Sequence, residues 1–156
     1  MSKSEFLSII RDILATEEFQ RMKKYRHHVK GNLYDHSVKV AYLCYLHHKK
    51  HGMDVDLAEF VRGALLHDYY LYDLHGCGRH RFHWFRHPRR ALENAIRHYP
   101  GLTMIQRDMI RRHMFPVTLT PPMTREGWLL CFYDKVAAVD DRLRGSRRAA
   151  RRKKRK

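Results

Sequence analysis

The stretch GALLHDYYLYD, residues 63–73, places a histidine beside an aspartate, His67 and Asp68, at the end of an apolar run. A buried carboxylate is costly unless a cation pairs with it or a metal ion binds it. The chain offers many more imidazole groups than the one of His67, because 13 of its 156 residues are histidines. The question is which other histidines and aspartates share an apolar face with this pair.

Helical spacing shows which further side chains of these types face an apolar side of the chain. Asp134 has small or apolar residues three and four positions away in both directions, so it is centred on an apolar stripe. His36 enters an apolar face, His87 lies at a helix start in line with two alanines, and His113 closes a helix. Any one of them alone is more often a hydrogen-bonded core group, and Asp134 alone could pair with an arginine. The set of four histidines and two aspartates favours a metal centre.

These six candidates offer only nitrogen and oxygen ligands. Structural zinc sites are four-coordinate and often rich in thiolates, so this set argues against one. Imidazole and carboxylate ligands suit Fe, Mn, Co, Ni or catalytic Zn. Six protein ligands suit two divalent metal ions about 3.5–4 Å apart, bridged by a carboxylate and a water or hydroxide. Such a pair generates a nucleophile at neutral pH and holds a phosphoryl oxygen. His75, His80 and His83 compete with His87 as the ligand that this segment of the chain provides.

The elements that must position these residues are helices, because the apolar period is helical nearly throughout. Residues 72–86 show no clean period and are predicted to form a loop, and no alternating strand pattern occurs. The sequence therefore predicts an all-α compact bundle of about six helices in a single domain over residues 1–144. The expected helices cover about residues 4–22, 34–51, 54–68, 88–100, 103–113 and 124–144.

Charge is distributed unevenly along the chain. The net charge is +16, and residues 142–156 contain 10 lysines and arginines without an acid. We expect residues 145–156 to form a disordered basic tail that contacts nucleic acid nonspecifically through its phosphates. Apolar residues make up 44 %, but no apolar stretch is long enough to span a membrane. Three widely spaced cysteines and the lack of a signal-peptide pattern favour a cytoplasmic location.

The order of His36, the His67–Asp68 pair and Asp134 on successive helices resembles the HD-domain metal-dependent phosphohydrolase superfamily. ALLHDYYLYD is similar to the end of the central helix of that family, and DKVAAVDDR is similar to its closing helix. HPRRALENA and IIRRHM resemble the two additional histidine segments of members that hold two metals. The resemblance covers about residues 32–142.

The resemblance implies a role for each candidate. Asp68 would bridge two metal ions, and it and His67 would be catalytic. One position departs from the family pattern, because Leu71 stands where many members carry a lysine three residues after the central aspartate. A phosphate contact or a proton donor expected at this position must then come from elsewhere or be missing. The terminal ligands would be His36, His67, His87, His113 and Asp134.

A basic and aromatic stretch next to two of the proposed ligand segments suggests the substrate. HGCGRHRFHWFRHPRR, residues 75–90, holds five arginines and four histidines among aromatic residues. Arginine suits phosphate and aromatic rings suit bases, so we expect a nucleotide-like or nucleic-acid substrate. The alternative is a surface loop with solvated arginines. The candidates for binding the substrate are Arg79, Arg81, Arg86 and, beside Asp134, Lys135.

The sequence thus supports three functions from different classes. The leading hypothesis is a phosphohydrolase that cleaves a nucleotide-like phosphoester or phosphoanhydride by metal-activated hydroxide. The alternative is an RNA-associated binding or regulatory protein that uses the bundle as a scaffold and its basic tail for nucleic acid. A third is oxygenase chemistry at two irons, which some relatives perform, and the many arginines favour phosphate over it.

Overall fold

A computed structural model describes residues 2–27, 31–72 and 83–153. Within these ranges the chain forms seven α-helices and one 3₁₀ helix, and its only strands form a two-stranded antiparallel hairpin. The predicted all-α fold is therefore confirmed. The elements are α1 (Lys3–Leu14), α2 (Glu17–Gln20), η1 (Arg21–Lys24), β1 (Arg26–His27), β2 (Gly31–Asn32), α3 (Leu33–His51), α4 (Leu57–Leu66), α5 (His83–His98), α6 (Met104–Arg112) and α7 (Arg125–Lys153).

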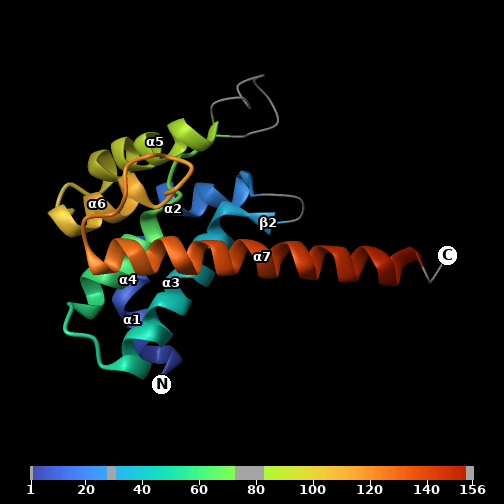
Figure 1. The fold of residues 1–156 in the computed structure, drawn as a ribbon, viewed down its shortest axis with the longest axis horizontal. Helices are drawn as coiled ribbons and strands as arrows, with labels where there is room; N and C mark the ends of the chain where they lie inside the picture. Colours follow the sequence, from blue (N-terminus) through green and yellow to red (C-terminus); the bar gives the residue numbers. More distant parts are fainter. Residues whose placement is uncertain (1, 28–30, 73–82, 154–156) are drawn as a thin grey trace.

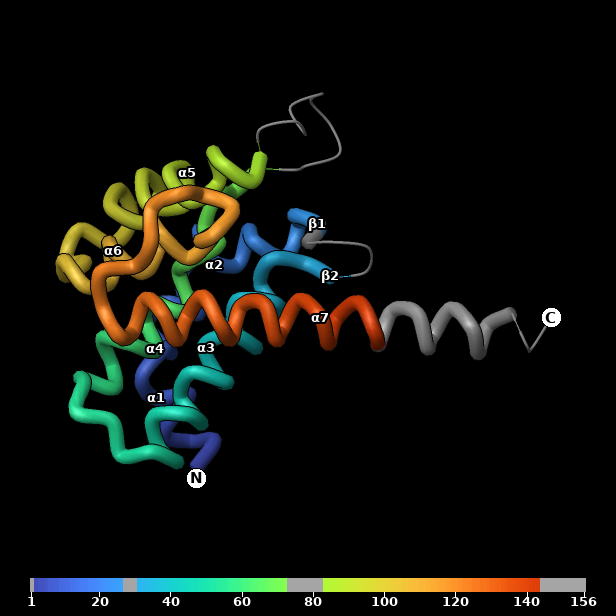
Figure 2. The backbone as a smooth tube through the Cα atoms, viewed as in Figure 1, coloured from blue at the N-terminus to red at the C-terminus, as the bar shows by residue number. Residues whose placement is uncertain are grey.

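Helix α3 is the centre of the bundle. It packs on α4 and on α7, while α6 packs on α4, α5 and α7. Figures 1 and 2 show α7 crossing α3, on which it packs, and then continuing past the rest of the bundle toward the C-terminus. None of the helices in the described ranges combines the length and apolarity that crossing a bilayer requires.

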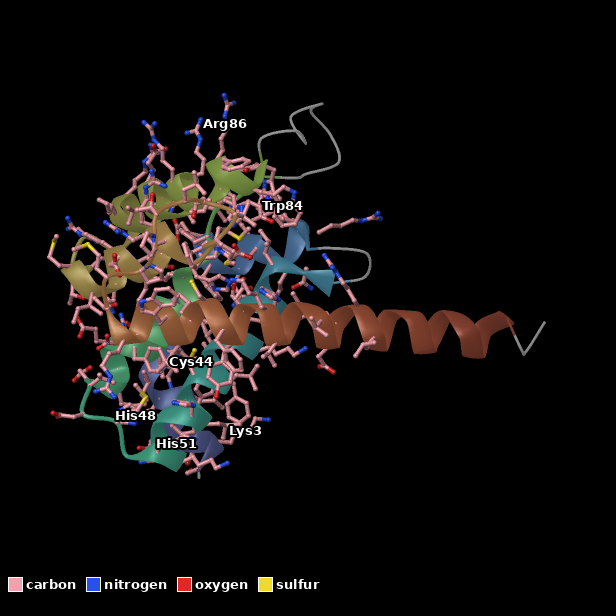
Figure 3. All side chains as sticks on the ribbon, viewed as in Figure 1. Lys3, Cys44, His48, His51, Trp84 and Arg86 are labelled. Carbon is pink, nitrogen blue, oxygen red and sulfur yellow. The ribbon has the colours of Figure 1, made fainter. Side chains whose placement is uncertain are left out.

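The core lies between these helices and is closed by large side chains. Tyr45, Phe60 and Tyr69 are fully buried, and Cys44 on α3 lies in the interior of the bundle (Figure 3). Histidines and aspartates interrupt this apolar interior at one place, where α3, α4, α5, α6 and α7 face one another. Polar groups that are buried in this way need partners or a ligand.

Local capping places two of these polar residues at helix ends. The Asn32 side chain accepts a hydrogen bond from the backbone N–H of Asp35, so α3 begins just before His36. Helix α4 ends at Leu66, and His67 is its C-cap. Asp68 follows directly, and the chain then turns at Leu71, whose φ of 53° lies in the left-handed region. Helix α4 thus ends before Asp68, and the side chains of His67 and Asp68 remain buried in the core.

Three helix boundaries differ by five residues or more from those predicted. Helix α1 ends at Leu14 rather than near residue 22, because the Thr16 side chain caps a separate short helix, α2. Helix α5 begins at His83 rather than at Pro88, which lies just beyond the first turn, so part of the predicted loop is helical. Helix α7 continues beyond residue 144 to Lys153, because its arginines, alanines and lysine favour helix and no proline interrupts them. The segment expected to be disordered is therefore helical as far as Lys153.

Candidate metal centre

Three side chains from α3, the end of α4 and α7 meet in the core. The Nε2 atom of His36 lies 3.0 Å from Oδ1 of Asp134, and Nε2 of His67 lies 3.5 Å from the same oxygen. The ligand atoms of the three residues all lie within 4.8 Å of one another, as a single metal ion requires. Both histidines are buried, and the Asp134 side chain retains 13 % of its surface.

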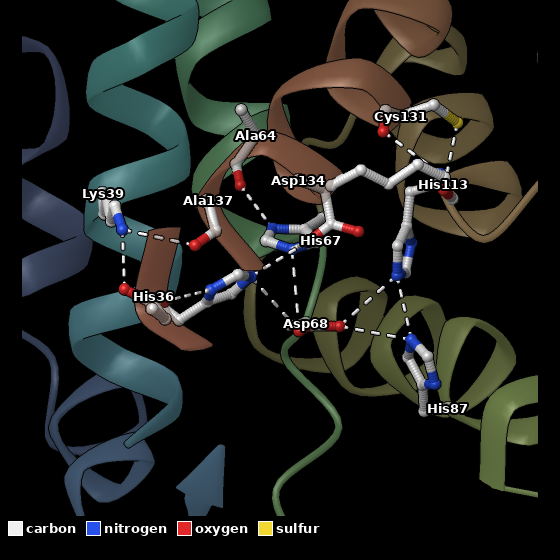
Figure 4. Close-up of polar contacts among 12 residues, drawn as sticks. His36, Lys39, Ala64, His67, Asp68, His87, His113, Cys131, Asp134 and Ala137 are labelled. Carbon is white, nitrogen blue, oxygen red and sulfur yellow. Dashed lines mark hydrogen bonds and ion pairs between the residues drawn. The ribbon is translucent and has the colours of Figure 1, made fainter. Parts of the chain in front are cut away.

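A second group lies on the other side of Asp68. Its Oδ1 atom is 3.3 Å from Nε2 of His87 and 3.3 Å from Nε2 of His113. The two Nε2 atoms are themselves 2.9 Å apart. The other carboxylate oxygen, Oδ2, faces Nε2 of His67 at 3.6 Å and Nε2 of His36 at 3.9 Å. The two oxygens of Asp68 thus face two different sets of imidazoles (Figure 4).

The orientation of the imidazoles shows what these atoms can bind. Nδ1 of His67 donates to the backbone oxygen of Ala64 at 2.8 Å, and Nδ1 of His113 donates to that of Ile110 at 2.8 Å. In the neutral ring the proton is then on Nδ1, so Nε2 presents a lone pair to the carboxylates. The buried Nε2 of His67 lies 3.5 Å from Oδ1 of Asp134. Lone pairs and carboxylate oxygens that converge in this way fit a metal cation, with backbone carbonyls fixing the tautomers.

An outer layer of charged groups supports His36. Its Nδ1 atom donates to Oδ2 of Asp141 at 3.4 Å. Lys39 donates to Oδ1 of Asp141 at 2.6 Å, to Asp140 at 2.7 Å and to the backbone oxygen of Ala137 at 3.3 Å. Sequence reasoning missed this layer. The available signal was the spacing of Asp141, seven residues or about two turns after Asp134, which puts both on one face of α7.

These contacts set the protonation states in the cluster. Burial lowers the pKa of His36, but hydrogen bonds to Asp134 and Asp141 outweigh it and raise the pKa to about 9. Burial raises the pKa of Asp134, but hydrogen bonds with His36 and His67 hold it well below its usual range. Burial lowers the pKa of His113. Asp134 is thus ionised and His113 neutral at pH 7, the states in which these groups bind metals, whereas His36 carries a proton that a bound metal ion would displace.

A pocket of about 390 Å³ opens beside the cluster. Asp68, His87 and Asp134 form one part of its lining. Lys135 and Arg142 from α7 bring positive charge to it, and apolar residues complete much of the wall. A volume of this size holds a small molecule, and the cluster is reachable from it.

The structure brings all six sequence-predicted ligand candidates together, from five different helices or helix ends. His83, one turn before His87, is also buried, but its Nδ1 hydrogen-bonds the hydroxyl of Tyr72 at 2.8 Å and its ring stacks on His87 at 4.6 Å. His87, not His83, is the α5 histidine with a short contact to Asp68. Two further histidines, His48 and His51, lie at the far end of α3, away from the cluster (Figure 3). The competing candidates His75 and His80 lie outside the described residues.

The predicted substrate-binding residues divide into three groups. Lys135 lines the pocket beside the cluster, and its ammonium donates to the backbone oxygen of Cys131 at 3.1 Å. Arg86 is exposed on α5 and lines a different, adjoining pocket. Arg79 and Arg81 lie outside the described residues.

Comparisons with known proteins give one family. A family model described as HD domain matches residues 33–139, a range that contains all six residues of the cluster. No curated protein and no solved structure matches the chain.

Proposed function

Since the chain belongs to the HD-domain family, as its resemblance predicted, we propose that it is a metal-dependent phosphohydrolase. Its substrate would be a nucleotide-like phosphoester or phosphoanhydride, and its cofactor two divalent metal ions such as Fe, Mn, Co, Ni or Zn. Membership in this family and a histidine–aspartate cluster that could hold a metal ion support the proposal.

The orientation of Asp68 is the observation that carries the proposal. One of its oxygens faces His36 and His67, and the other faces His87 and His113. A carboxylate shared in this way suits a bridge between two metal ions. His36, His67 and Asp134 would hold one ion, and His87 and His113 the other.

When bound, the metal ions would supply an activated water and neutralise charge on a phosphoryl group. The chain's own groups would do the rest. Asp141 would keep the ring of His36 oriented and raise its basicity as a ligand. Lys135 and Arg142 line the same pocket and would attract the phosphate and offset its charge. Trp84, in the wall of that pocket, offers a ring on which a base could stack.

Leu71 bears on how phosphate is held, because a lysine is common at this position in the family. Leu71 is half-buried and lines the adjoining pocket rather than the one beside the cluster. A phosphate contact would therefore come from α7, where Lys135 and Arg142 line the pocket beside the cluster.

Hydrolysis assays would test this function. The protein, supplied with Mn²⁺ or Fe²⁺, would be screened against nucleoside mono-, di- and triphosphates, cyclic nucleotides and p-nitrophenyl phosphate. We expect turnover that requires the metal and is lost in Asp68→Ala. The matched control Asp54→Ala removes an exposed aspartate and should keep the activity. Full activity in Asp68→Ala would refute the proposal.

A second candidate function follows from the charge of the chain. The net charge is +16, and α7 carries its basic segment past the bundle (Figure 1). This supports an RNA-associated protein in which the bundle is a scaffold. Deletion of residues 145–156 should then abolish RNA binding and its dependence on salt. Binding that is unchanged by the deletion would exclude this function.

A further inference from the structure

A second pocket, of about 740 Å³, is rich in arginine and is lined by residues of α5, by Tyr70–Tyr72 and by Arg21. Tyr70 and His83 line both this pocket and the one beside the metal cluster, so the two adjoin each other. Figure 3 shows Arg86 pointing outward from α5 and Trp84 on the same helix. We call this pocket the arginine groove, after the five arginines that line it: Arg21, Arg86, Arg89, Arg90 and Arg97.

The groove carries a large excess of positive charge. Glu93 is the single acidic residue among the described residues that line it. It pairs with Arg89 at 2.8 Å and with Arg90 at 3.3 Å, so it orients these two guanidinium groups and offsets one charge. Arginine forks bind phosphate oxygens in pairs, so such a surface favours a polyanion with several phosphates.

The dimensions of the groove show how many phosphates it suits. Arg86 and Arg97 are eleven positions apart on α5, a length of about 16 Å along the helix axis. A stacked strand carries one phosphate about every 3.4 Å, so several consecutive phosphates fit over this length. A single phosphate would leave most of the groove empty.

Two features favour a single strand with unpaired bases. Trp84 and Phe85, in the first turn of α5, are 42 % and 53 % exposed, and exposed rings of this kind stack on unpaired bases. The adjoining pocket of about 390 Å³ has the size of a site for one small molecule. It would take one nucleotide at the end of a strand and would exclude the end of a duplex.

We propose that the arginine groove binds the phosphate backbone of a single-stranded nucleic acid whose terminal nucleotide enters the pocket of the metal cluster. This inference rests on the proposed function, because it names a substrate class for the same site. It differs from binding through the basic end of α7, because the groove lies beside the cluster and would align the strand with it.

Fluorescence anisotropy with a short, labelled single-stranded RNA tests the groove. The variant Arg21→Gln/Arg97→Gln removes two of its arginines. The matched control Arg11→Gln/Arg111→Gln removes two exposed arginines that do not line it. Both proteins keep residues 145–156 and have the same net charge, so attraction to the basic end of α7 is equal in the two.

We expect the groove variant to bind the strand about tenfold more weakly than the control. Loss of two phosphate contacts should also reduce the slope of log affinity against log salt by about 1.4, at about 0.7 for each contact of a single strand. Equal affinity and equal slope in the two variants would overturn the inference and would leave the basic end of α7 as the binding segment.

A separate assay keeps this inference distinguishable from the proposed function. Hydrolysis of p-nitrophenyl phosphate, which is too small to occupy the groove, reports on the wild-type metal cluster alone. Weaker strand binding by the groove variant, together with no hydrolysis by the wild type of p-nitrophenyl phosphate or of any nucleotide in the screen, would support the groove and refute the proposed function. Hydrolysis by the wild type, together with equal strand binding by both variants, would refute the groove and support the function.

Discussion

Removing the outer carboxylate Asp141 should weaken metal binding without removing a proposed ligand. The substitution Asp141→Asn keeps the size of the side chain but takes away the charge that faces Nδ1 of His36. Substitution of such outer partners costs about 10–100-fold in metal affinity. The contact is long, at 3.4 Å, and the Asp141 side chain is 34 % exposed, so we expect the lower end of this range. A tenfold loss corresponds to about 1.4 kcal/mol.

The neighbouring residue provides a matched control. Asp140→Asn makes the same change in charge and removes the 2.7 Å contact between Asp140 and Lys39. Among the described residues, Asp140 and His36 form no ion pair within 4.0 Å. Competition of each protein with a chelator for Mn²⁺ would give the affinities. We expect Asp141→Asn to bind about tenfold more weakly than Asp140→Asn. Equal affinities in the two variants would refute the assignment of Asp141 as the group that orients His36.

Three further predictions concern the bundle that positions the cluster. Phe60→Ala, at a fully buried position, should lower the free energy of unfolding by about 3–5 kcal/mol in urea titrations, and a smaller loss would mean that the core collapses around the cavity. Thr103→Ala breaks the capping box with Gln106 and should cost about 1 kcal/mol in the same titration, whereas Thr118→Ala, outside the helices, serves as its comparison. Arg62 hydrogen-bonds Asp12 and lowers the pKa of this carboxyl. The stability that this ion pair contributes should therefore be present above the pKa of Asp12 in the unfolded chain, 3.8. It should be lost as the pH falls through the lower pKa of Asp12 in the folded protein. The contribution of this ion pair to the free energy of unfolding is below about 1 kcal/mol, because Asp12 is exposed. A loss of stability that is due to Asp12 and begins well above pH 3.8 would contradict this prediction.

Much of the bundle and the cluster could be predicted from periodicity. The inward face of each helix repeats every three to four residues, so Asp134 and His36 could be placed in the core from their apolar neighbours alone. The order of the helices then indicated that ligand candidates from different segments lie on helix surfaces that face one another. This reasoning works where a residue's own helix determines which way it points.

Contacts that depend on packing between helices could not be predicted in the same way. The bond from His36 to Asp141 joins residues 105 positions apart, and only the packing of α3 on α7 brings them together. The start of α5 at His83 was missed because Pro88 is typical of a first helical position, whereas here the helix begins earlier. The arginine groove likewise forms only when Arg21 comes next to α5.

The metal content of the protein shows directly whether the histidine–aspartate cluster holds metal ions. Protein purified without a chelator or an affinity tag would be analysed for transition metals beside Asp68→Ala, with Asp54→Ala as the control. We expect about two metal ions per chain in the wild type and the control, and their loss in Asp68→Ala. A wild-type protein that holds no metal and takes up none from added Mn²⁺ or Fe²⁺ would contradict this expectation, and so would equal metal content in all three proteins.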